Sequence, residues 1–140
     1  MKELNFNTGL VTYSINGKCE VSFNATDIDF CERLFNVFDG LERKQSDYEE
    51  RATKMADKRE IFKLMRERDA EMREQIDDLL DGPVCEAMFG RMNVFALADG
   101  LPVWCNLLLT IMDQVDTTFA REQKATNPRV QKYMDKWKKK

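Results

Sequence analysis

The chain has 140 residues, of which 43% are apolar and 34% are charged. This length suits one domain with its own core, and the nine Phe and two Trp argue against a disordered chain. The sequence contains no histidine, which removes the commonest general base and the commonest metal ligand. It also contains no phosphate-binding glycine loop and no hydrolase motif. We therefore expect a protein that is not an enzyme and that uses no cofactor.

The net charge of −3 is unevenly distributed along the chain. Residues 129–140 contain six Lys or Arg and one Asp, so this tail carries +5 and the rest of the chain −8. An acidic body with a basic end predicts electrostatic contact with another protein surface, including that of a second copy. The overall acidity argues against a dedicated nucleic-acid-binding protein.

The cysteine spacing and the lengths of the apolar runs indicate the cellular location of the protein. Spacings of 12, 54 and 20 residues between the four cysteines match no zinc ribbon or finger, so we expect free thiols and no metal. The first residues lack the apolar stretch of a signal peptide. The longest apolar run, residues 101–112, is shorter than the ~20 residues that a membrane-spanning helix needs. We expect a cytoplasmic protein with no membrane contact. The cysteines are Cys19, Cys31, Cys85 and Cys105.

Two alternating apolar runs on either side of an Asn-Gly pair at 16–17 predict an antiparallel β-ribbon. A two-residue loop would place the two apolar sets on opposite faces. A three-residue loop pairs Tyr13 with Val21 or Cys19 and places both sets on one face, which favours that register. The alternative is a ribbon covered on both faces. Leu4 and Phe6 continue the alternation, so the predicted ribbon covers residues 4–24 and includes a third strand.

Residues 27–81 are predicted to form long helices, beginning after an N-cap at Thr26. Residues 41–81 contain neither Gly nor Pro, and 23 of these 41 residues are charged. Apolar residues recur at steps of three and four over 31–55 and again over 62–79. A helical hairpin that turns near 56–59 would bury both series within one chain. One long rod would instead pair them with a neighbouring chain; we favour the hairpin.

Eight residues of these two series form the predicted self-association or partner surface, which we call the seam. Gln45 interrupts the first series, and Asp69 interrupts the second. Gly40 lies in a predicted helix interior, where glycine costs ~1 kcal/mol, which suggests a kink or a close helix crossing. The seam consists of Leu41, Gln45, Tyr48, Met55, Phe62, Met65, Met72 and Ile76.

Residues 83–125 are predicted to form the core helices. Gly82-Pro83 marks a helix boundary, and apolar residues then follow helical spacing from 84 to 95. After a break at 99–102, a helix from Val103 to about Lys124 is apolar almost all round at its start. Such a helix is predicted to lie at the centre of a core or of an oligomer.

The sequence thus predicts a mainly α protein with a small N-terminal β-ribbon, built as a helical bundle. Residues 1–128 form a single α+β domain, and residues 129–140 form a basic C-terminal helix or a tail that orders on a partner. Val130, Tyr133, Met134 and Trp137 would share one stripe of that helix. The residues predicted to make the basic tail contact are Lys132, Lys136, Trp137 and Lys138.

Two segments carry a family resemblance. They read FNATDIDFCERLFNVFDGLERKQ and GPVCEAMFGRMNVFALADGLPVWCNLLLTIMDQVD. The chain resembles small, largely uncharacterised proteins encoded in phages and prophages of Gram-positive bacteria. Some of these proteins resemble tail assembly chaperones in size, acidic character and a β-ribbon followed by helices. The resemblance implies a homo-oligomer in the host cytoplasm that binds the phage tape-measure protein and recruits tail-tube subunits.

A second hypothesis is a phage-encoded inhibitor of a bacterial defence system. Such an inhibitor would bind a host protein and block a protein-binding or nucleotide-signal site. Both hypotheses place the function in protein–protein contacts, and they differ in whether the partner is a phage tail protein or a host protein.

Overall fold

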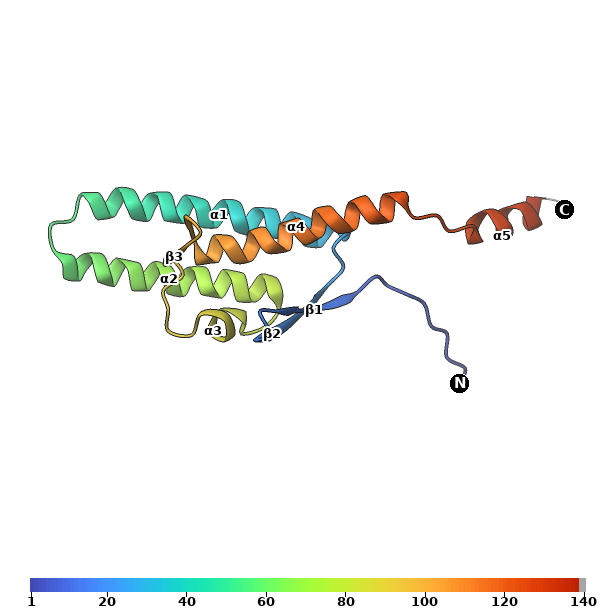
Figure 1. Cartoon of the computed structure of the whole chain (residues 1–140), viewed down its shortest axis with the longest axis horizontal. Helices are drawn as coiled ribbons and strands as arrows, with labels where there is room; N and C mark the ends of the chain where they lie inside the picture. Colours follow the sequence, from blue (N-terminus) through green and yellow to red (C-terminus); the bar gives the residue numbers. More distant parts are fainter. Residues whose placement is uncertain (139–140) are drawn as a thin grey trace.

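A computed structural model describes residues 1–138. As predicted, the protein is mainly α-helical with a small N-terminal β-ribbon. The molecule is elongated: α1, α2 and α4 run along its length, while the ribbon and α3 lie along one side (Figure 1). The elements are β1 (Val11–Ile15), β2 (Cys19–Phe23), α1 (Ile28–Thr53), α2 (Lys58–Leu80), α3 (Val84–Phe89), β3 (Leu97–Ala98), β4 (Leu101–Pro102), α4 (Val103–Lys124) and α5 (Arg129–Lys138).

The ribbon has the predicted register. Tyr13 pairs with Val21, which confirms a three-residue loop between β1 and β2. Asn16 and Gly17 have φ values of 52° and 66°, in the left-handed region that Asn and Gly adopt most easily. The Tyr13 and Phe23 rings stack with centroids 4.7 Å apart. Both apolar sets therefore face the same side, where they pack on the core.

The start of the ribbon and the start of α1 differ from the prediction. The ribbon begins at β1 and not at residue 4: Leu4 and Phe6 are 93% and 82% exposed and form no third strand. The N-cap of α1 is Asp27, one residue later than predicted, and its carboxylate accepts a hydrogen bond from the Asp29 amide. Thr26 instead donates to the side chain of Asn24.

The long charged region is a helical hairpin, as we favoured, and not a rod. α1 and α2 lie antiparallel along the molecule and are joined at the end farthest from α5 (Figure 1). The connection covers residues 54–57, close to the predicted turn, and ends at Asp57, whose side chain caps α2 by accepting from the Arg59 amide at 2.9 Å. The sequence holds no Gly or Pro at this turn. A side-chain cap therefore takes the place of a helix breaker.

The inward face of α2 matches the predicted one at Met72 and Ile76 but differs nearer the turn. Leu64 is 4% exposed, whereas Phe62, which was assigned to the seam, is 55% exposed. Counting back from the fully buried Ile76 and Met72 in steps of four gives Arg68 and then Leu64. The inward stripe thus passes through a charged residue, which a search for apolar spacing skips.

The second half of the chain covers the hairpin. The helix predicted over 84–95 ends early, at Phe89, because Gly90 takes a φ of 55° that stops it. A short β3–β4 ribbon and then α4 follow, and α4 has the predicted range. Within α4, Trp104 is 2% exposed and Leu108 is fully buried. Gly40 marks no close crossing, since a Cβ added there would meet nothing within 4 Å.

Candidate protein-binding surfaces

Three of the eight seam residues lie inside the chain's own core, and two more are half-buried against other parts of the chain. Leu41, Met72 and Ile76 have no exposed surface. The Oε1 of Gln45 accepts a 2.8 Å hydrogen bond from the indole of α4. The ring of Tyr48 stacks on a phenylalanine of the 90–96 loop, with centroids 4.8 Å apart. A neighbouring chain cannot reach Leu41, Met72 or Ile76 while the bundle is closed, whereas Gln45 and Tyr48 are half-buried and already in contact with the chain's own residues.

The rest of the seam lies nearer the tip of the helical hairpin. Met55 and Met65 are half-buried, and Phe62 is exposed. Partner binding through the seam therefore stays a prediction for this tip, with Phe62 as its most accessible member.

The second polar interruption, Asp69, holds the 90–96 loop against α2. Its Oδ1 accepts a 2.8 Å hydrogen bond from the Val94 amide, and its Oδ2 lies 3.0 Å from the Nε of Arg73. The Arg73 guanidinium donates to the carbonyls of Gly90 and Met92. Val94 is fully buried. Asp69 and Arg73 thus anchor a loop that the sequence had suggested was helical.

A four-residue network of charges links α1 to α2. Arg68, only 18% exposed at its side chain, lies 3.0 Å from Asp47 and 2.9 Å from Glu71. Lys44 also lies 3.0 Å from Glu71. The hydrogen bond from Lys44, assisted by Arg68, lowers the pKa of the Glu71 carboxyl against an opposing effect of burial. The network fixes how the two helices align, and apolar spacing gave no sign of it.

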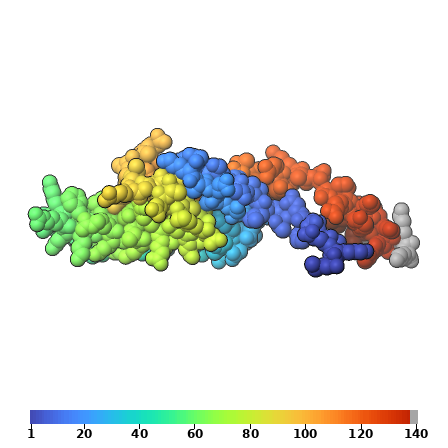
Figure 2. All heavy atoms as spheres, turned by 90° about the horizontal axis from the view of Figure 1, so that it is seen from below, coloured from blue at the N-terminus to red at the C-terminus, as the bar shows by residue number. Residues whose placement is uncertain are grey.

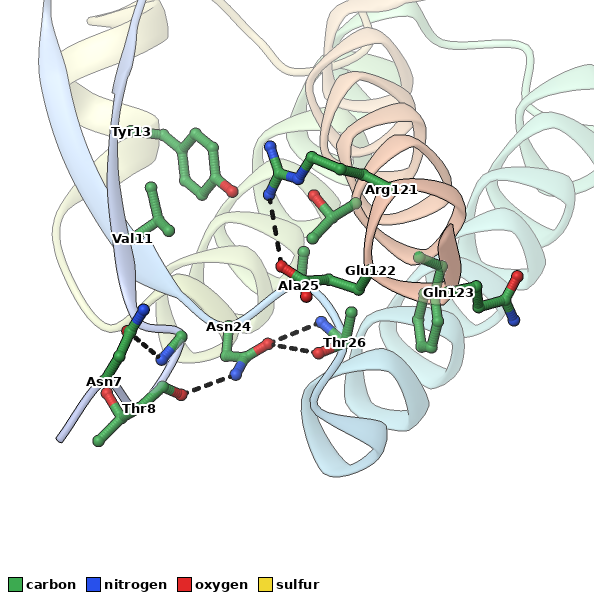
Figure 3. Close-up of a pocket in the computed structure, with 13 residues that line it drawn as sticks. Asn7, Thr8, Val11, Tyr13, Asn24, Ala25, Thr26, Arg121, Glu122 and Gln123 are labelled. Carbon is green, nitrogen blue, oxygen red and sulfur yellow. Dashed lines mark hydrogen bonds and ion pairs between the residues drawn. The ribbon is translucent and has the colours of Figure 1, made fainter. Parts of the chain in front are cut away.

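The N-terminal arm, residues 1–10, extends beyond β1 with large apolar side chains exposed. Leu4 is 93% exposed, Phe6 82% and Leu10 62%. At the base of the arm, the Nδ2 of Asn24 donates to the Thr8 carbonyl at 2.9 Å. Figure 3 shows Asn24 between the arm and the start of α1, where its Oδ1 accepts two hydrogen bonds from Thr26. The base of the arm is therefore fixed, while Leu4 and Phe6 farther out are left almost fully exposed.

A cleft of about 630 Å³ opens between the base of this arm, the 24–26 loop and the last turns of α4. Amide and hydroxyl side chains make up much of its wall, and the Arg121–Glu122 ion pair lies on one side at 4.0 Å (Figure 3). Asn7, Thr8 and Asn24 already form hydrogen bonds within the chain. The cleft is therefore a polar hollow whose wall is held largely by the chain's own hydrogen bonds.

Helix α5 projects from the far end of α4, away from the bundle (Figure 1). Its predicted apolar stripe is exposed: Val130 by 73%, Tyr133 by 48%, Met134 by 47% and Trp137 by 72%. Of the predicted basic contacts, Lys132 and Lys136 are exposed. The backbone of Lys138 ends α5, and its side chain lies outside the described residues.

The two apolar ends leave the molecule on the same side. The N-terminal arm and α5 both extend from the end opposite the α1–α2 turn, and the two views, a quarter turn apart, agree (Figures 1 and 2). The cleft of Figure 3 lies between their points of attachment, because both the arm and α4 line it.

Within residues 1–138, none of the helices combines the length and apolarity that a bilayer crossing requires. The same residues include no cluster of three or more Cys, Asp or Glu side chains placed to hold a metal ion. The chain matches no protein-family model, no curated protein and no solved structure.

Proposed function

We propose that this chain is a helper protein that binds another protein through the exposed apolar segments at one end of its bundle. In its specific form the proposal is a tail assembly chaperone, which associates with itself and binds the tape-measure protein during phage tail morphogenesis. One observation supports it above the others. The N-terminal arm and α5 expose large apolar side chains from the same end of a bundle whose own core is closed.

Exposed apolar segments of this kind have a cost. They favour association, and monomeric proteins rarely retain extended apolar patches without a use for them. Here neither segment packs on the core, yet the arm is held at its base by Asn24. An anchored, extended arm beside a polar cleft is suited to receiving a segment of a client chain. The exposed charged residues along α2 would keep such a complex in solution.

Co-expression with a tape-measure fragment from the same phage genome tests the proposal. We expect the native chain to keep the fragment in the soluble fraction and to co-purify with it. The double variant Leu4→Ser/Phe6→Ser should lose the fragment, because it removes the apolar side chains of the arm. The matched control Met92→Ser/Leu97→Ser changes two other exposed apolar residues and should keep it.

A native chain that neither binds nor solubilises the fragment would exclude the tape-measure client. Capture of a defence protein from the host, at fixed stoichiometry and without any tail protein, would instead favour the inhibitor hypothesis.

A further inference from the structure

The outer face of α1 carries a second apolar surface that the fold leaves uncovered. Ile28 and Phe35, two turns apart on the same side of the helix, are 67% and 68% exposed. Acidic residues at steps of three and four lie between and beyond them, and all of them are exposed. We call this surface the outer α1 stripe; it consists of Ile28, Glu32, Phe35, Asp39 and Glu42.

The charge of this stripe is only partly neutralised. Asp39 pairs with Arg43, whereas neither Glu32 nor Glu42 forms an ion pair within residues 1–138. The stripe continues into a shallow depression of about 470 Å³, whose wall holds four carboxylates and one arginine. Of these four carboxylates, only Glu42 has no ion pair within residues 1–138. Phe35 lies between Glu42 and the unpaired Glu32 along α1, which makes an unfavourable surface to leave in water alone. It suits a partner that is apolar and basic at once.

Helix α5 has this chemistry. Its four apolar residues follow helical spacing and share one face, and Arg129, Lys132 and Lys136 lie along one flank of that face. Its 10 residues make a helix of ~15 Å, and the stripe extends over a similar ~20 Å of α1. Val130 and Trp137 are seven residues apart, like Ile28 and Phe35, so they can meet these two residues while the basic flank of α5 lies beside Glu32. Glu42, two turns beyond Phe35, adds to the negative charge at that end of the stripe.

We infer that α5 of one copy binds the outer α1 stripe of a second copy, and that the second copy returns the same contact. This inference rests on the self-association in the proposed function and assigns it a surface. A two-fold exchange makes both contacts identical. The exchange also doubles the buried area. This matters because stable interfaces bury ~800 Å² per partner, which is a large area for one short helix.

The arrangement of the chain indicates that α5 binds the outer α1 stripe of a second copy and not the stripe of its own chain. α5 continues outward beyond α4 and does not fold back over α1 (Figure 1). A membrane surface would account for a basic amphipathic helix. It would leave Ile28 and Phe35 uncovered, however, and anionic headgroups would repel the carboxylates around them.

Sedimentation across a concentration series, with two charge-reversal variants, tests the exchange. Lys132→Glu/Lys136→Glu makes α5 acidic, and Glu32→Lys/Glu42→Lys makes the stripe basic. Each variant alone brings like charges together at both contacts, so its dimer dissociation constant should rise ~10-fold or more. A mixture of the two variants restores opposite charges at both contacts and should form a heterodimer.

Two matched controls change the same number of charges on exposed residues of α2. Lys63→Glu/Arg66→Glu and Glu67→Lys/Glu74→Lys should dimerise like the native chain. The inference is overturned if the native chain is monomeric throughout the series, or if the mixed variants fail to associate. Binding of native protein to phosphatidylglycerol vesicles with a blue shift of tryptophan emission, with no dimer in solution, would identify a membrane as the occupant.

The two proposals can fail separately. If the charge reversals change the dimer as expected while no variant binds the tape-measure fragment, the α5 contact holds and the chaperone role does not. If the fragment co-purifies while the native chain is monomeric, the role stands and the assigned surface is wrong.

Discussion

The indole Nε1 of Trp104 donates a 2.8 Å hydrogen bond to the side-chain Oε1 of Gln45, across 59 positions of the sequence. The indole is 2% exposed, and the ring of Phe38 lies beside it with centroids 5.4 Å apart. The polar interruption in the apolar series of α1 is thus the point at which α4 docks. Because the bond is shielded from water, its loss should cost more than that of a surface contact.

Replacing Gln45 with Leu should destabilise the fold by about 1–3 kcal/mol, since the buried indole N–H would lose its acceptor. Urea unfolding followed by circular dichroism measures this change. Gln123→Leu, on an exposed position of α4, is the control and should have little effect. Equal stability of the two variants would show that water or another group can replace Gln45.

Replacing Gly40 with Ala should stabilise the protein by about 0.5–1 kcal/mol, because Gly40 lies inside α1 and glycine is costly there. The added Cβ would meet nothing within 4 Å. Thermal melting measures the gain.

Gly9→Ala is the contrasting variant: Gly9 has a φ of +77°, and a Cβ added there would collide with the side chain of Asn24. That change should loosen the N-terminal arm, and amide hydrogen exchange in the arm should become faster. A Gly9→Ala variant that is more stable than the native chain would contradict our description of the arm's base.

Acid should weaken the α1–α2 contact through Glu71. The pKa of this carboxyl is lower in the folded protein than its ordinary value, chiefly because of the hydrogen bond from Lys44. Its stabilising effect is therefore complete above the unfolded pKa and is lost as pH falls through the lowered folded pKa. Melting temperatures measured from neutral pH to about pH 3 should fall less steeply for Glu71→Gln than for the native chain. Glu67→Gln, at an exposed position of the same helix, should follow the native curve.

The four thiols should react with a thiol reagent in two classes. Cys85 is fully buried, and burial raises its pKa to about 12, so its thiolate is scarce at neutral pH. Cys19 and Cys31 are only partly buried. We expect modification of these two first, with the buried Cys85 and Cys105 reacting only as the protein unfolds. Mass spectrometry after timed labelling checks the order. Early labelling of Cys85 would mean that the region around α3 opens readily.

Structural features that depend on local sequence patterns were predicted well. The Asn-Gly turn and the requirement for one buried face fixed the register of the ribbon, because a shift of one residue would expose the apolar set. The start of α4 followed from the break at 99–102 and from the apolar residues after it. The hairpin turn was placed close to 54–57 although no helix breaker marks it, because only a turn lets both apolar series be buried in one chain.

What the sequence did not predict depends on contacts between distant residues. Arg68 occupies an inward position on α2 because Asp47 on α1 is there to receive it, and no local pattern shows that partner. The path of the 90–96 loop depends on Asp69 of α2, which accepts a hydrogen bond from the Val94 amide. Nothing in the sequence showed that Trp104 and the 90–96 loop cover Gln45 and Tyr48 of the seam.

The position of the chain ends has a practical consequence for anyone who labels this protein. A tag or a fused reporter at either terminus would crowd the end that carries the exposed apolar segments, and could mask binding without harming the fold. The connection between α1 and α2, residues 54–57, lies at the opposite end of the molecule (Figure 1). A dye or a small inserted domain there would leave both termini untouched.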